Sequence, residues 1–243
     1  NLSTEDAKLL EDLYESFKAN GATLNKDDKE KYRKLSMDLS MLTLQFDQNA
    51  LKDKNRFELL ITDENELSGL PESARDAAAM LAKSKDKDGW LFNLSAPSYI
   101  PFMRYSDKRD LREKMYREYM SVGNKGDEFD NKDIIKKIVN IRLEIAQLMG
   151  FKNYAEYALE HTMAKNSANV YKLLNQLLEA YKPIAINEYN AVEGFALGTE
   201  KENITVMPWD WSYYSNKLKD KKFNINEEML RPYFELEQVK KGV

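Results

Sequence analysis

The sequence predicts a mainly α-helical protein, a multi-helix body with a minor two-stranded β element. Apolar residues recur at spacings of three and four along most of the chain, which is typical of helices buried along one side. The chain has only nine glycines and six prolines, and 32% of its residues are charged. That composition favours long, solvated helices over β-sandwiches or low-complexity segments.

The first two helices are delimited by capping residues. Ser3 is a typical N-cap for the first helix, and Gly21 is a typical stop. Asn25 and Asp28 offer a second cap, and the long helix that follows carries an apolar stripe as far as Phe46. The short connection predicts that the two helices form an antiparallel hairpin.

The helical pattern breaks in the middle of the chain. The runs RFELLIT (residues 56–62) and GWLFNL (89–94) are short and apolar, and ESARDAAAMLAKS between them reads as a helix. We therefore expect two brief strands that pair across a helical insert. Pro97 and Pro101 are expected to bracket a turn.

Two further helices follow this region. One begins after Asp107 and ends at Gly123, and the strongest helix of the chain ends at Gly150. Asp130 is the expected N-cap of the strongest helix, and Asp133 lies at its capping-box position. Its apolar stripe contains Ile134, Ile138, Ile141, Ile145 and Leu148.

The C-terminal part is also predicted to be helical. A short helix over NYAEYALEHTM precedes a long one, which Pro183 should kink near Lys182. Another helix begins near Asp210, and Asn226 caps the last one. Because no repeat or flexible linker divides the chain, residues 1–243 are expected to form a single helical domain or domain fragment.

Composition excludes several classes of protein. The chain has no cysteine, so disulfides and thiolate chemistry are absent. The net charge of −4 is unfavourable for nucleic-acid binding, and Lys136–Lys137 and Lys217–Lys222 are interpreted as solvated faces. No run reaches the roughly 18 apolar residues of a membrane span. We expect a soluble protein, with the compartment left open between cytoplasm and periplasm.

No self-contained catalytic site is visible. His161 is the only histidine, so an H-E-x-x-H zinc site is impossible within this chain, and no phosphate-binding glycine loop is present. We interpret His161 as a surface or capping residue at a helix end. Glu156 and Glu160 could share one helix face, but such pairs are usually solvated. The sequence therefore predicts no catalytic and no metal-binding residue here, and it does not single out substrate-binding residues.

A family resemblance extends this interpretation. The segment DNKDIIKKIVNIRLEIAQLMGFKNYAEYALEHTMAKN resembles a stretch of the thimet-type zinc oligopeptidases, the M3 peptidases. PWDWSYYSNKL and EEMLRPYFELEQVKKGV are similar to two later segments of that family, and GATLNKDDKEKY, ELSGLPE and APSYIPFMRYS to earlier ones. The bacterial peptidyl-dipeptidases, or dipeptidyl carboxypeptidases, are the subgroup the sequence resembles most. The matching residues of the first segment are Arg142, Glu144, Ala146, Leu148, Gly150, Phe151, Tyr154, Ala155, Leu159, Met163 and Ala164.

The resemblance covers only part of the family's sequence. In the family the H-E-x-x-H helix and a further glutamate ligand follow the Arg-Pro-Tyr-Phe segment, whereas this sequence stops at Val243. The family also has sequence before the position that matches Asn1. The resemblance therefore implies an internal fragment, truncated at both ends, that belongs to one half of a larger two-lobed helical peptidase.

This relationship implies a function for the parent protein. It would be a zinc metallopeptidase that hydrolyses short, unstructured peptides and releases C-terminal dipeptides, with this chain forming a wall of the substrate channel. The zinc and the C-terminal catalytic portion of the same polypeptide would lie outside this chain, which is expected to be inactive alone. Two alternatives remain open, an endo-acting oligopeptidase of the same family and a stand-alone helical module that binds a protein partner.

One aromatic cluster raises a separate question. Trp209, Trp211, Tyr213 and Tyr214 lie within six positions of the segment MPWDWSYYSNKLKDKK. They could form a peptide-binding shelf, but clustered aromatic residues mainly supply buried area. We therefore expect them to pack a helix that bridges to the rest of the enzyme.

Overall fold

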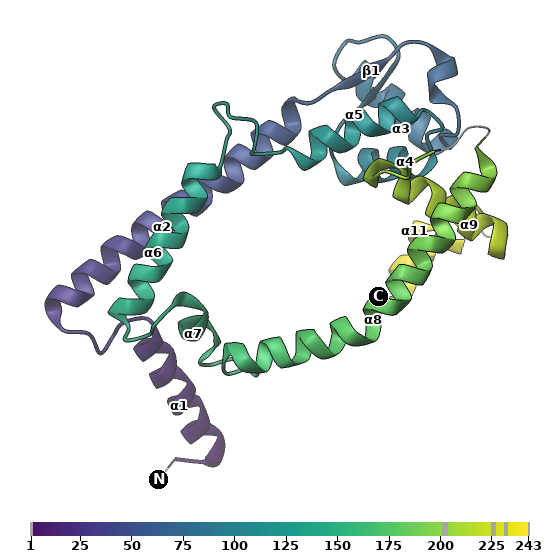
Figure 1. Ribbon diagram of the computed structural model, residues 1–243. Helices are drawn as coiled ribbons and strands as arrows, with labels where there is room; N and C mark the ends of the chain where they lie inside the picture. Colours follow the sequence, from purple (N-terminus) through teal and green to yellow (C-terminus); the bar gives the residue numbers. More distant parts are fainter. Residues whose placement is uncertain (1, 201–203, 225–226, 231–232, 243) are drawn as a thin grey trace. The chain divides into compact units, whose positions relative to one another are not determined.

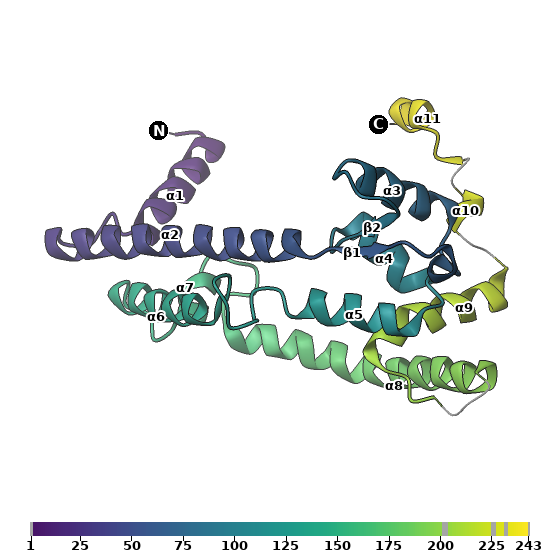
Figure 2. The same cartoon turned by 90° about the horizontal axis from the view of Figure 1, so that it is seen from above.

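The computed structural model describes residues 2–200, 204–224, 227–230 and 233–242 (Figures 1 and 2). It confirms the mainly helical fold with a two-stranded antiparallel sheet. The helices are α1 (Thr4–Ala19), α2 (Lys26–Arg56), α3 (Glu72–Lys83), α4 (Ala96–Tyr105), α5 (Arg109–Met120), α6 (Lys132–Leu148), α7 (Tyr154–Leu159), α8 (Ser167–Thr199), α9 (Trp211–Phe223), α10 (Glu227–Leu230) and α11 (Leu236–Gly242).

The chain divides into two compact units, each built from two separate stretches of sequence. The first unit contains Asn1–Ala50 and Gly126–Ala180, and the second contains Leu51–Lys125 and Tyr181–Val243. None of the helices in the described ranges is both long and apolar enough to cross a membrane.

The expected caps of the first unit are present, but the expected helical hairpin is not. Ser3 accepts a hydrogen bond from the Asp6 N–H (3.1 Å), and Asn25 accepts one from the Asp28 N–H (3.0 Å). The apolar stripe of α1 remains exposed, with Phe17 66% accessible. Figure 1 shows α1 leaving the turn at a wide angle to α2. The prediction of an antiparallel hairpin was wrong because the turn sets the direction of α1, and no described apolar residue of the unit covers its stripe.

Polar side chains connect separate stretches of the first unit. Asn49 of α2 donates to the side-chain oxygen of Asn131 (3.1 Å), and Asn131 donates in turn to the backbone carbonyl of Phe46 (3.0 Å). The Tyr157 hydroxyl of α7 donates to the carbonyl of Ala19 at the end of α1 (2.7 Å). Buried polar groups that satisfy each other in this way fix the alignment of these elements.

The start of α6 differs by one residue from the prediction. Asn131 occupies the N-cap position, and its side chain makes no capping hydrogen bond. Asp130 instead accepts from the Lys132 N–H (2.9 Å) and from the Gly126 N–H (2.6 Å). The Asn131 side chain donates instead to the Phe46 carbonyl of α2, and the neighbouring aspartate satisfies one free N–H group of the first turn, that of Lys132.

The predicted apolar stripe of α6 is buried only in part. Ile134 and Ile145 are buried, whereas Ile138 and Ile141 are only half-buried. We expect Ile145→Ala to lower the free energy of unfolding by about 2–5 kcal/mol, as for other buried Ile-to-Ala changes. Urea denaturation should show a smaller loss for Ile138→Ala. As a control, Val139→Ala on the exposed face should change stability by less than about 0.5 kcal/mol. A larger cost at Ile138 than at Ile145 would contradict this assignment.

The second unit contains the predicted sheet. Strand β1 (Leu59–Ile61) pairs antiparallel with β2 (Trp90–Phe92), and Leu59 lies opposite Phe92. Both strands are shorter than the apolar runs that predicted them. The sheet forms one side of a hydrophobic core that also receives side chains from α3, α4 and α5. The fully buried members of this core with less than 2% exposure are Leu67, Phe92, Leu94, Phe102 and Met115.

The segment with two prolines forms helix α4 rather than the expected turn. Pro97 lies in the first helical turn, where a missing N–H needs no partner. Pro101 lies inside the helix. The cost of this proline is offset by burial, because Phe102 and Met103, the next two residues, are both buried in the core. Tertiary packing therefore overrides the local signal.

Gly69 is required by both conformation and space. Its φ is +83°, and a Cβ would overlap the carbonyl oxygen of Tyr105. Gly126 has a similar φ of +73° but no atom within 4 Å of a Cβ. We expect Gly126→Ala to cost about 1–2 kcal/mol, the usual penalty of a left-handed residue. Gly69→Ala should cost distinctly more in urea denaturation, because the backbone must also move. Equal costs would show that the overlap is relieved without strain.

The predicted helix near Asp210 is confirmed, since Asp210 closes the short 3₁₀ turn η2 (Pro208–Asp210) immediately before α9. Helix α8 is continuous through Pro183, and the kink expected near Lys182 stays a prediction. The predicted cap at Asn226 lies outside the described residues.

Candidate functional site

Asp210 lies at the centre of a buried cluster of ion pairs in the second unit. Pro208 begins the turn η2, a position where proline costs no hydrogen bond, and the Met207 N–H donates to the Asp210 carboxylate (3.1 Å). Two arginines of α5 complete the cluster. Arg109 Nη2 lies 2.7 Å and Arg112 Nη2 lies 2.8 Å from the carboxylate oxygens. The Asp210 side chain is fully buried.

Arg112 is buried and uses all three of its side-chain nitrogens. Besides the contact with Asp210, Nη1 donates to the carbonyl of Ser106 (2.8 Å) and Nε to the carbonyl of Trp209 (3.3 Å). Its guanidinium also lies over the ring of Tyr213, 4.0 Å from the centroid. A buried charge is tolerated when it is paired and hydrogen-bonded in this way. The arginine therefore ties α5 to the start of α9.

The electrostatics of Asp210 are dominated by two opposing effects. Burial by itself raises the pKa of a carboxyl, because the charged form loses its water. The hydrogen bonds from Arg109 and Arg112 outweigh that effect, and they hold the pKa of Asp210 below its ordinary value. The carboxylate is therefore ionised at neutral pH, and all its hydrogen-bond partners are internal to the unit.

A second polar network joins α9 to the end of α4. The Tyr213 hydroxyl donates to Asp107 Oδ1 (2.6 Å), and Ser68 donates to Oδ2 (2.7 Å). Lys217 contacts both Asp107 and the Tyr213 hydroxyl. Burial raises the pKa of Tyr213, and the neighbouring carboxylate adds to the effect. Burial opposes ionisation of Asp107, but these donors prevail and lower the pKa of this carboxyl.

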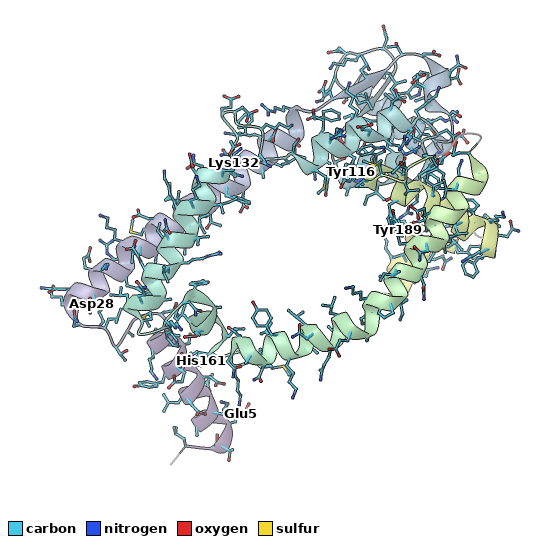
Figure 3. The ribbon with its side chains drawn as sticks, in the orientation of Figure 1. Glu5, Asp28, Tyr116, Lys132, His161 and Tyr189 are labelled. Carbon is cyan, nitrogen blue, oxygen red and sulfur yellow. The ribbon has the colours of Figure 1, made fainter. Side chains whose placement is uncertain are left out.

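The packing interpretation of the aromatic cluster holds for three of its four residues. Trp209, Tyr213 and Tyr214 are buried. The fourth, Trp211, is 38% exposed and stacks in parallel on Tyr189 of α8, with 5.9 Å between ring centroids and 6° between planes. Figure 3 labels Tyr189 on its helix.

Trp211 also lines two surface hollows, one between α8 and residues 206–211 and one between α8 and the rest of α9. One has a volume of about 590 Å³ and is lined by apolar residues that include Ala185, Tyr189 and Pro208. The other has a volume of about 360 Å³ and is lined by Val192, Ser215 and their neighbours. We call the two hollows together the α8/α9 groove. Their volumes lie in the range of small-ligand and peptide side-chain sites.

The single histidine behaves as a surface residue. The side chain of His161 is 47% exposed, and its Nε2 lies 3.5 Å from the carboxylate of Glu160 (Figure 3). Glu156 instead accepts from Asn153, whose side chain caps α7. Among the residues that the structure describes, no three histidine, aspartate or glutamate side chains come together as a metal site. The prediction that this chain lacks a zinc site remains to be tested.

The chain is similar to proteins of known family. Residues 102–243 match peptidase family M3, and the chain belongs to this family. It is 37% identical over 240 residues to oligopeptidase A of Salmonella typhimurium, which covers 96% of this chain and 35% of that protein. It is 38% identical over 247 residues to oligopeptidase A of Haemophilus influenzae (99% and 36% covered). It is 30% identical over 239 residues to dipeptidyl carboxypeptidase of Escherichia coli (98% and 35% covered).

The comparisons confirm the family that the sequence motifs indicated. They also show that the chain spans about a third of the length of these curated relatives. The matched region contains both arginines of the Asp210 cluster and the whole of α9. Sequence reasoning noted Asp210 but not Arg109 and Arg112, because they are about 100 positions away. Their spacing of three on a helix, which places two cations on one face, is the only local signal.

Proposed function

We propose that these 243 residues form a non-catalytic helical portion of a zinc metallopeptidase that hydrolyses oligopeptides. The observation that carries the proposal is the match of residues 102–243 to peptidase family M3. The similar proteins of Salmonella, Haemophilus and Escherichia coli bear peptidase names, and the chain aligns with about a third of each. The remaining two thirds leave room for the catalytic centre.

The Asp210 cluster supports a scaffolding role. A general base must accept a proton near neutral pH and must reach the substrate. Asp210 is fully buried, accepts hydrogen bonds from Arg109, Arg112 and Met207, and has a lowered pKa. This cluster positions helices rather than transferring protons. The role we propose for the chain is therefore to form one wall of a substrate channel.

The similarities favour oligopeptides as the substrate class. The two proteins named oligopeptidase A are 37% and 38% identical to this chain, whereas the dipeptidyl carboxypeptidase of Escherichia coli is 30% identical. Hydrolysis of oligopeptides is thus the first hypothesis. Release of C-terminal dipeptides, which the sequence motifs first indicated, is the second hypothesis, since the similarity to the carboxypeptidase extends over 98% of this chain.

The proposal that the protein uses zinc rests only on its membership of peptidase family M3. Catalytic zinc usually takes three protein ligands and keeps one position for water. The residues described here do not fit that requirement, because His161 is half-exposed with Glu160 as its only ionic contact and no cluster of three candidate ligands forms. We place the metal ligands in other parts of the polypeptide, and no catalytic step is assigned to residues of this chain.

Product analysis of the longer polypeptide tests the proposal. The protein is produced by following the encoding reading frame beyond Val243, and a ten-residue peptide is incubated with it and analysed by mass spectrometry. We expect cleavage that a chelator abolishes and products that include internal fragments. Products that shorten only by dipeptides from the C-terminus would support the second hypothesis. A reading frame that ends at Val243, with no cleavage, would instead support the stand-alone interaction module.

A further inference from the structure

We propose that the α8/α9 groove is a binding site for a short acidic peptide that carries an apolar or aromatic side chain. The choice of a peptide as the ligand rests on the proposed function. The groove is distinct from the Asp210 cluster, which uses its polar atoms internally, and it lies within the second unit. Three features define the ligand: an exposed aromatic pair, a buried hydroxyl, and two lysines, the last two without a hydrogen-bond or ion-pair partner among the described residues.

The aromatic pair supplies an apolar platform. Trp211 and Tyr189 stack in parallel and remain 38% and 42% exposed. Each ring holds the other in place, so the platform is formed before a ligand arrives. Rigid, partly exposed tryptophan and tyrosine side chains are the residues that most often dominate binding energies. The hollow of about 590 Å³ beside them is lined by further apolar atoms of Ala185, Val206 and Pro208. An aromatic or branched aliphatic side chain fits this environment.

Ser215, one of the residues that line the second hollow, has a buried side-chain hydroxyl without a partner among the described residues. The Ser215 hydroxyl of α9 is buried, and within the described part of the chain no donor or acceptor reaches it. Ser215 lines the hollow of about 360 Å³ together with Val192 and Leu218. A buried hydroxyl without a partner costs roughly 1–3 kcal/mol. A peptide backbone offers both N–H and C=O groups, and either would satisfy this hydroxyl.

The lysines of the second hollow favour a negatively charged ligand. Lys219 and Lys222 line the same hollow, and neither forms an ion pair with a described carboxylate. Lys217, by contrast, is paired with Asp107, and Lys221 lies over the ring of Phe195. Lys219 and Lys222 are three positions apart on one helix, and neighbouring like charges repel.

One acidic residue opposes the two lysines. Glu188 of α8 lines the same hollow, so two positive charges face one negative charge and the groove retains a net positive charge. A ligand with carboxylate side chains relieves the repulsion between Lys219 and Lys222. The groove therefore selects glutamate or aspartate beside the apolar side chain, and it disfavours lysine.

Direct binding to the 243-residue chain tests the site without any requirement for hydrolysis. The probe is the blocked tetrapeptide Ac-Leu-Phe-Glu-Glu-NH2, followed by isothermal titration calorimetry and by tryptophan fluorescence. We expect saturable binding and a change in emission, because Trp211 is the exposed tryptophan of the platform. The matched probe Ac-Leu-Phe-Lys-Lys-NH2 should bind at least about tenfold more weakly. Equal binding of the two probes, or no binding of the acidic one, would overturn the proposal.

Charge reversal on the groove provides the matched variants. Lys219→Glu/Lys222→Glu should weaken binding of the acidic probe about tenfold or more, because two attractive contacts become repulsive. Lys136→Glu/Lys137→Glu, on exposed positions of the first unit, makes the same change in net charge and should leave affinity unchanged. Equal losses in both double variants would show non-specific attraction and contradict the site.

Three further measurements keep the test decisive if the groove variant unfolds. Binding to the unsubstituted chain should weaken between 50 and about 500 mM salt, since exposed charge pairs are screened. Ser215→Ala should weaken binding several-fold while leaving the stability of the free chain unchanged or higher, because it removes an unpaired buried hydroxyl. Sedimentation should show a monomer before peptide is added. A dimer that the peptide does not dissociate would assign the groove to a second copy of the chain.

Failure of this test is distinguishable from failure of the proposed function. Binding to the groove is measured on the 243-residue chain, whereas peptide cleavage is measured on the longer polypeptide. Cleavage without binding to the groove would leave the peptidase assignment intact and remove only this site.

Discussion

Replacing Asp210 with asparagine is expected to lower the free energy of unfolding by about 3–5 kcal/mol. Breaking a buried ion pair from one side leaves an uncompensated charge in a site without water, and that is the source of the cost. The charge left without its ionic partner is that of Arg112, which is 1% exposed and lies against the ring of Tyr213. Urea denaturation at neutral pH measures the change as a shift in midpoint at constant slope.

An exposed ion pair on the same helix provides the control for this result. Glu113 accepts from Arg117 across one turn of α5 (2.7 Å) at the surface. Glu113→Gln should change stability by less than about 1 kcal/mol, as is usual for exposed pairs. A cost below about 1 kcal/mol for Asp210→Asn would mean that water reaches the Arg112 guanidinium.

The same substitution predicts a pH dependence with a definite sign. The pKa of Asp210 is lowered in the folded protein, so its stabilising effect is fully present above the unfolded value of about 3.9. That contribution disappears as the pH falls through the folded pKa. The difference in stability between the unsubstituted chain and Asp210→Asn should therefore be constant above about pH 5 and shrink below about pH 4. A difference that grows on acidification would contradict the lowered pKa.

A second large effect is expected at the hydrophobic core. Phe102→Ala should lower the free energy of unfolding by about 3–5 kcal/mol, because it removes a large buried ring and leaves a cavity. Phe102 is fully buried and packs edge-to-face on Phe92, with 4.8 Å between ring centroids. Phe223→Ala, at a ring that is 65% exposed, is the control and should change stability by about 0.5 kcal/mol or less. Similar costs for both substitutions in urea would place the core elsewhere.

Local signals in the sequence predicted local structure well. Ser3 and Asn25 cap their helices as expected, because an N-cap depends on atoms only two or three residues away. The two apolar runs likewise became the paired strands β1 and β2. Helix periodicity was correct for α6 as an element, although Ile138 and Ile141 of its stripe are less buried than Ile145.

Predictions that depended on distant contacts were less successful. Pro97 and Pro101 signal a turn locally, but the burial of Phe102 stabilises a helix there. The expected hairpin of α1 and α2 required packing that the exposed ring of Phe17 shows to be missing within the unit. Periodicity identifies an apolar face, but it does not identify what covers that face.

In the candidate site, too, local features were predicted from the sequence and distant contacts were not. The sequence predicted that all four residues of the aromatic cluster pack, and the burial of Trp209, Tyr213 and Tyr214 confirms this for three of them. It gave no indication that Asp210 pairs with Arg112, 98 positions earlier, or that Trp211 alone remains exposed beside Tyr189. Such pairings depend on the tertiary fold, and no spacing rule within one helix reaches them.

Zinc titration of the 243-residue chain tests the central claim, that this part of the protein is a scaffold without a catalytic metal. Calorimetry should detect only weak, carboxylate-type binding, because the chain has one histidine and no cysteine. A quenched peptide should stay intact in the presence of zinc. Tight zinc binding with zinc-dependent cleavage, retained on repurification and lost in His161→Ala, would contradict the account and place the catalytic centre within these residues.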